Sequence, residues 1–149
     1  MGMLLQGARP EKLAEAVACS VVCSLFPSFV IPALLNLTVG LGRGLNQPLM
    51  HAINSALTPL HLLMILVYVR LGEALWQSTD SSFSLSAMVD AFQQLPLSEF
   101  LQQFSRAGFH AVTAWAVTAP GLFLITYYPA RAALRRLAQL LPVKETPVG

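Results

Sequence analysis

Four polar residues inside one charge-free stretch of the sequence share a helix face. At about 100° per residue they fall within an arc of about 80°, and they are His51, Asn54, Thr58 and His61. Polar groups within a bilayer usually face the interior of a helix bundle, and an ionisable one is by default a functional-site hypothesis. Hydrogen bonds that only hold the bundle together are the alternative. We favour this alternative because hydroxyl, amide and neutral imidazole groups need no catalytic role.

No spacing typical of a metal site or a catalytic site accompanies these residues. Metal ligands on one helix are expected about one turn apart, whereas His51 and His61 are separated by roughly 15 Å of helix. Cys19 and Cys23 lie one turn apart without a second ligand pair, and we expect them to be small packing residues. No Asp or Glu occurs in the charge-free stretches to pair with a histidine. We therefore expect no metal, no cofactor and no enzymatic activity.

The number and placement of charges indicate an integral membrane protein. Of 149 residues only nine are basic and seven acidic, and 55% are apolar, whereas a typical soluble domain is about 25% charged. Charged residues are absent from 16–42, 44–69 and 107–130, and each stretch exceeds the roughly 20 residues that span a bilayer. The basic residues are too few and scattered for a nucleic-acid site, so the expected partner is the lipid bilayer.

Prolines interrupt the first charge-free stretch. Proline removes a helical N–H donor and clashes with the preceding turn, so one straight helix is not expected. The two halves would each be shorter than the roughly 30 Å hydrocarbon core. We therefore predict a re-entrant or broken helical hairpin over about 13–42, with a turn that includes Phe26, Pro27 and Pro32. A single kinked span is the alternative, and the sequence leaves it open.

Basic residues favour the hairpin, because cytoplasmic segments of membrane proteins carry an excess of Lys and Arg. If the hairpin enters and leaves on the cytoplasmic side, only Arg70 and Arg106 lie outside. The seven basic residues then inside are Arg9, Lys12, Arg43, Arg131, Arg135, Arg136 and Lys144. A single first span would change this distribution to five inside and four outside. We therefore predict a protein of the bacterial inner membrane with both termini in the cytoplasm.

Two full transmembrane helices are predicted, over about 48–70 and 108–128. Asn46 followed by Pro48 is typical of a helix start and begins the first of them. A basic cytoplasmic tail over 130–149, with a short helix from Ala130 to Leu141, is expected after the second. Aromatic and basic residues at this end are predicted to anchor lipid headgroups: Tyr127, Tyr128, Arg131, Arg135 and Arg136.

An extracytoplasmic amphipathic loop, 71–107, is expected between the two spans. Its apolar residues recur at helical spacing on both sides of Pro96: Leu85, Met88, Phe92 and Leu95, then Leu97, Phe100, Leu101 and Phe104. We predict two short helices within about 83–106, lying in the outer interface or forming a surface for a partner protein. The fold class is thus an all-α integral membrane protein, with residues 1–149 as a single membrane domain.

The order of these features resembles the bacterial family called domain of unknown function 2062. The similarity extends over about residues 8–138, and its motifs are Phe26-Pro27, Arg43 with Asn46, Asn54 with Thr58 and Pro59, Leu71-Gly72, and a final span with a basic tail. The resemblance implies a bacterial inner-membrane protein of unestablished activity. Its relatives are sometimes joined to glycosyltransferase domains, which implies work on envelope glycans or lipids.

Together these observations predict a non-enzymatic subunit or scaffold of an envelope-related membrane complex. Its partners would be other membrane proteins or further copies of itself. The alternative is a small transporter or lipid-handling protein, because broken helices at membrane depth are where transporters place their sites. The site would then lie between the hairpin turn and the polar face of the second span.

Overall fold

A computed structural model describes residues 9–28, 30–77 and 84–140. These residues form helices and connecting turns, without a strand, so the predicted all-α class is confirmed. The five helices are α1 (Pro10–Ser24), α2 (Ile31–Arg43), α3 (Gln47–Leu75), α4 (Leu85–Gln94) and α5 (Leu97–Leu140).

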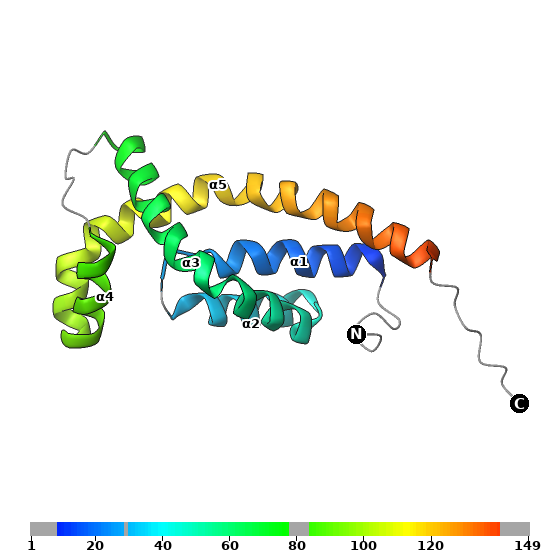
Figure 1. Ribbon diagram of the computed structural model, residues 1–149, viewed down its shortest axis with the longest axis horizontal. Coiled ribbons are helices and arrows are strands. Elements are labelled where there is room, and N and C mark those ends of the chain that lie inside the picture. The colour runs from blue at the N-terminus through cyan, green and yellow to red at the C-terminus, as the bar shows by residue number, and fades with distance from the viewer. Residues whose placement is uncertain (1–8, 29, 78–83, 141–149) are drawn as a thin grey trace, which may run out of the picture.

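The first two helices fold back on each other as a hairpin (Figure 1). α1 begins with Pro10, where a missing N–H leaves no bond unmade, and α2 has Pro32 in its first turn. The Asn36 side chain of α2 donates to Ser24 Oγ at the end of α1 (3.1 Å). At the other end of the hairpin, Arg43 donates to Glu15 (2.6 Å). Both ends of the pair are therefore fastened by side chains.

A tight connection joins α2 to α3. Gly44 ends α2 with a φ of 61°, a left-handed conformation that glycine adopts without strain. Asn46 then caps α3, since its side-chain oxygen accepts from the Leu49 backbone N–H (3.0 Å). The predicted start of this helix is therefore confirmed. Its end lies beyond the predicted residue 70, because Arg70 and Glu73 form an ion pair one turn apart (2.9 Å) on the helix surface.

α5 corrects the predicted division of the C-terminal part. An outer amphipathic helix, a span over 108–128 and a separate helix from Ala130 were expected, but a single helix of 44 residues includes all three. It continues past Pro120 and Pro129. In Figure 1 its first turns, beside α4, run at a steep angle to the rest of the helix, which is gently bowed. The sequence between Phe104 and Gly108 contains no proline, and alanines follow Pro129, so nothing ends the helix at either place. Residues 141–149 of the predicted tail lie outside the described residues.

α1 lies beside α5, and α3 crosses them obliquely (Figure 1). One core cluster joins all three helices and includes Leu25, Tyr68, Val69, Ala111 and Ala114. A second joins α1 to the start of α3 through Ala16, Cys19, Leu45 and Met50. Cys19 and Cys23 are buried free thiols, in agreement with their predicted packing role.

Among the residues that the structure describes, two helices are long and apolar enough to cross a membrane: Gln47–Leu75 and the part of α5 over Gln102–Leu140. They correspond to the two predicted spans. α1 and α2, with 15 and 13 residues, reach only about 20 Å each at 1.5 Å per residue. Each is thus shorter than the roughly 30 Å hydrocarbon thickness of a bilayer.

The crossing of α3 over α5 depends on a glycine. A Cβ atom at Gly72 would overlap the His110 backbone carbonyl, so only glycine permits this approach of the two helices. A Gly72→Ala variant should therefore lose about 1–3 kcal/mol of stability through overpacking, measured as a lower melting temperature in detergent. Gly121→Ala is the matched control, since nothing lies within 4 Å of its Cβ position. If Gly72→Ala melted no earlier than Gly121→Ala, the close crossing would be wrong.

Candidate functional site

The end of α1 is the point where the polar side chains of the two long helices meet the hairpin. The last carbonyl groups of any helix lack partners within that helix. Here the Val22 carbonyl accepts from the indole Nε1 of Trp115 on α5 (3.1 Å). The Phe26 carbonyl accepts from the Ser28 backbone N–H (2.7 Å) and bonds to Nε2 of His61 on α3 (2.8 Å). The hairpin turn is therefore held from both sides.

The hydrogen bond to Phe26 determines the tautomer of His61. A carbonyl oxygen only accepts, so the proton of the ring must be on Nε2. The ring is buried, with 7% of the residue exposed, and its position is fixed by this bond. His61 thus acts as a capping donor for the hairpin turn.

A second polar group joins α1, α2 and α3 beside the cap. The amide nitrogen of Asn36 lies within hydrogen-bond distance of Ser24 Oγ (3.1 Å) and of Asn54 Oδ1 (3.3 Å). Ser20 of α1 donates to the Met50 carbonyl of α3 (2.8 Å). Asn36, Ser20 and Ser24 are all buried. These buried hydrogen bonds help to fix the relative positions of the three helices, although Oδ1 of Asn36 is buried without a hydrogen-bond partner among the described residues.

The predicted polar face of α3 divides into two pairs of residues. Asn54 and His61 point toward the hairpin and bond to it. His51 and Thr58 lie at the other edge of the arc and are exposed, and the Thr58 hydroxyl donates to the Asn54 carbonyl of its own helix (3.1 Å). The structure therefore brings two of the four residues, Asn54 and His61, into contact with the hairpin.

The residues predicted for the hairpin turn lie between α1 and α2. Phe26 supplies the carbonyl that His61 caps, and its ring packs edge-on against Trp115, with centroids 4.9 Å apart. Pro27 is part of the connection, and Pro32 is buried in the first turn of α2.

Ion pairs gather where α1 begins and α5 ends. Glu11 accepts from Nε and Nη2 of Arg135 (2.9 and 2.6 Å), and Arg131 lies 3.7 Å from the same carboxylate oxygen. The hydrogen bond from Arg135 holds the pKa of Glu11 below its ordinary value. Glu15 pairs in turn with Lys12 (3.1 Å) and Arg43. This end of the molecule is thus a network of alternating charges.

The predicted headgroup anchor belongs partly to this network. Arg131 and Arg135 contact Glu11, so their charges are partly used within the protein. Tyr127 stacks on Phe123, with ring centroids 5.6 Å apart. Tyr128 and Arg136 are exposed and remain accessible to a lipid headgroup.

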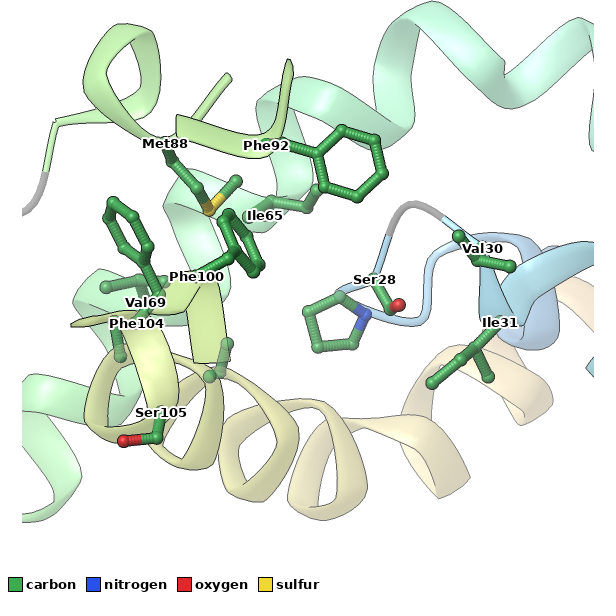
Figure 2. A pocket seen from close by; sticks show the side chains of 14 residues that line it. Ser28, Val30, Ile31, Ile65, Val69, Met88, Phe92, Phe100, Phe104 and Ser105 are labelled. Atoms are coloured by element: carbon green, nitrogen blue, oxygen red, sulfur yellow. The ribbon is translucent and has the colours of Figure 1, made fainter. Parts of the chain in front are cut away.

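An apolar cavity of about 540 Å³ lies on the other side of the hairpin turn. Figure 2 shows side chains from the turn, from α3 and from α4 and α5 around it. No pattern in the sequence indicates this cavity. The apolar spacing of Met88 and Phe92, and of Phe100 and Phe104, gave each helix an apolar face, but it gave no sign that the faces meet across a cavity.

Within the part of the chain that the structure describes, no three His, Cys, Asp or Glu side chains lie close enough together to hold a metal ion. The arrangement offers two kinds of chemistry instead. Neutral hydrogen bonds cap the carbonyl groups at the end of α1. Apolar side chains line a cavity whose volume is within the range usual for ligand sites, about 300–1,000 Å³.

Removal of the capping donors should loosen the hairpin. His61→Phe and Trp115→Phe each leave a carbonyl of α1 or its turn without a side-chain donor, at an expected loss of about 1–3 kcal/mol of stability. Melting in detergent measures the effect, and His61→Gln, which keeps an N–H donor, should recover part of it. His51→Phe, at an exposed position of the same helix, is the control. Equal melting temperatures for His61→Phe and His51→Phe would rule out the capping role.

The Glu11 ion pairs should make stability depend on pH in the acid range. A carboxyl group whose pKa is lowered in the folded state stabilises the fold above its unfolded pKa and loses that contribution as pH falls through the folded value. The contribution of Glu11 should therefore be complete above pH 4.5, the ordinary value, and disappear below it. The melting temperature of Glu11→Gln should be lower than that of the wild type at neutral pH, and the gap should close in acid. A gap at Glu11 that persists in acid would contradict the ion pairing.

Comparison with known proteins places the chain in a family. The sequence profile of a group described as an uncharacterized protein conserved in bacteria (DUF2062) matches residues 2–140. No curated protein and no solved structure matches the chain significantly. The matched region contains all five described helices and extends over nearly the whole chain. The protein therefore belongs to the DUF2062 family, as the order of its motifs predicted.

Proposed function

We propose that this protein is a non-enzymatic subunit or scaffold of an envelope-related complex in the bacterial inner membrane. α3 and α5 would span the bilayer, and the α1–α2 hairpin would enter and leave on the cytoplasmic side. The association with the cell envelope rests on the family resemblance.

The capped end of α1 is the observation that carries this proposal. Irregular backbone is tolerated at membrane depth only where it is buried in protein or lines a wet cavity. His61 is the middle residue of α3, so a bilayer centred on α3 would place the hairpin turn near its midplane. The bonds from His61 and Trp115 provide the partners that backbone carbonyls need there. These bonds support the proposal of a re-entrant hairpin.

The distribution of charge supports the orientation. The ion pairs of Glu11 with Arg135 and of Glu15 with Arg43 bring the basic residues of α1, α2 and α5 to one end of the molecule. Arg70 belongs to the last turns of α3, and Arg106 lies 29 residues before Arg135 in α5. An excess of positive charge at one end favours the cytoplasmic side for that end.

The use of the polar side chains supports a non-enzymatic role. Asn54 and His61, the sharpest candidates for chemistry in the sequence, form bonds that hold the hairpin. The alternative of a transporter with a polar site on this face of α3 is less well supported for the same reason. α4 and the first turns of α5 form an arm beside the bundle (Figure 1), and such an arm is available to a partner protein on the outer side.

One labelling experiment tests orientation and partnership together. Cysteine replaces the exposed Gln94 on α4 or, as the matched variant, the exposed Ala132 near the end of α5. A membrane-impermeant maleimide that carries a photoreactive group is then added to intact spheroplasts. We expect it to label Gln94→Cys alone, because the native Cys19 and Cys23 are buried, and to crosslink that site to one defined protein on illumination.

Different outcomes reject different parts of the proposal. If the external reagent labelled Ala132→Cys and not Gln94→Cys, the orientation would be wrong. If Gln94→Cys were labelled but illumination gave only the uncrosslinked monomer, the subunit role would be abandoned. A crosslink to a second copy of the chain would identify a homo-oligomeric scaffold.

A further inference from the structure

We propose that the apolar cavity beside the hairpin turn binds one hydrocarbon chain of a membrane lipid, taken from the outer leaflet. This inference goes beyond the subunit role. It rests on the proposed placement of α3 across the bilayer, and on the proposed orientation for the choice of leaflet.

The chemistry of the walls matches a hydrocarbon chain. Fourteen residues line the cavity, and none of them is charged. Ser28 and Ser105 are the only residues with polar side chains in this lining. A polar ligand needs several hydrogen-bonding groups to fix its orientation, and an apolar cavity does not hold water well. An uncharged, apolar occupant is therefore favoured.

The floor of the cavity is rigid, whereas one wall is adaptable. Val69 of α3 and Ala111 of α5, each 1% exposed, belong to the core where these helices cross. Beside Val69 the lining continues with Met88 and a group of phenylalanine rings (Figure 2), of which Phe92 and Phe100 meet edge-on at 5.6 Å. Methionine and aromatic side chains can shift to fit an irregular apolar ligand. Such a wall fits a flexible chain.

The cavity lies at the depth of a lipid chain. Ile65 and Val69 line it and precede the end of α3 at Leu75 by about 15 and 9 Å along the helix, at 1.5 Å per residue. Half of a bilayer's hydrocarbon is roughly 15 Å thick. The cavity thus occupies the outer half of the proposed span, between the hairpin turn and the arm formed by α4 and α5.

The rim is continuous with the surface that would face lipid. Val30 and Ile31, at the start of α2, are 69% and 40% exposed, and Phe92 of α4 is 42% exposed. In Figure 2, Val30 and Ile31 stand across the open space from the three phenylalanines. A chain in the surrounding bilayer can therefore enter without crossing a polar barrier. Since lipid chains are the molecules at hand at this depth, we commit to them as the occupant.

Two glycines provide a matched pair of variants for a test. Gly108 lines the cavity, and a Cβ there meets no atom within 4 Å, so Gly108→Leu should fill the space without a clash at its root. Gly121 is equally open on the same helix but lies outside the cavity, so Gly121→Leu is the control. Both variants place the same side chain on α5.

The full-length protein is reconstituted in vesicles of phosphatidylethanolamine and phosphatidylglycerol that contain a phosphatidylcholine with a diazirine on one acyl chain. After illumination, mass spectrometry identifies the crosslinked peptides. We expect crosslinks to concentrate on the α4 peptide with Met88 and Phe92. We expect Gly108→Leu to reduce them about tenfold or more, since one methylene in an apolar pocket changes binding by at least that much. Gly121→Leu should leave them unchanged.

The proposal is overturned if Gly108→Leu, shown by its melting curve to be folded, crosslinks at the α4 peptide as strongly as Gly121→Leu. It is also overturned if crosslinks are spread evenly over the exposed faces of α3 and α5, which is the result for ordinary surrounding lipid. Neither result bears on the cysteine labelling of Gln94, so failure of the lipid site and failure of the proposed subunit role are distinguishable.

Discussion

The unpaired carbonyl groups at the end of α1 are the constraint on which the arrangement of the molecule depends. A helix of 15 residues that ends inside the fold needs donors for its last turn, and backbone alone supplies only some of them. Trp115 of α5 supplies the donor for the Val22 carbonyl of α1. His61 of α3 adds a second bond to the Phe26 carbonyl of the following turn, which also accepts from Ser28. The two donors belong to different long helices. The hydrogen bonds to these carbonyl groups therefore fix the positions of α1, α3 and α5 relative to one another. The crossing at Gly72 and the contact between Asn36 and Asn54 are consistent with that placement.

Different kinds of interaction stabilise the region around the hairpin turn and the region where α1 begins and α5 ends. Around the hairpin turn, neutral hydrogen bonds and apolar packing dominate, and such interactions are strong where water is excluded. At the opposite end, Glu11 and Glu15 are in ion pairs with exposed arginines, which are screened by salt and individually weak. The interactions around the hairpin turn are therefore the stronger ones, and the ion pairs where α1 begins and α5 ends are the weaker ones. The cavity adjoins the hairpin turn.

Sequence patterns predicted what is local and missed what is distant. The prolines predicted the break between α1 and α2, and the capping residue Asn46 predicted the start of α3. Both predictions succeed because these effects act within one helical turn. Periodicity placed His61 on a polar face. The bond that uses it joins residues 35 positions apart, and the bond from Trp115 joins residues 93 positions apart, distances over which spacing says nothing. The continuity of α5 at residue 129 was missed for the opposite reason: Pro129, at the predicted boundary, is a strong local signal that the helix overrides.

The long separation between Val22 and Trp115 has a consequence for the order of synthesis. Ribosomes add about 5–20 residues per second, so the Val22 carbonyl waits roughly 5–20 s for the indole that caps it. The hairpin is complete as a pair of helices long before that time, yet it reaches its final partners only when α5 emerges. The last helix to be synthesised, α5, is therefore the one that caps the end of the first helix, α1.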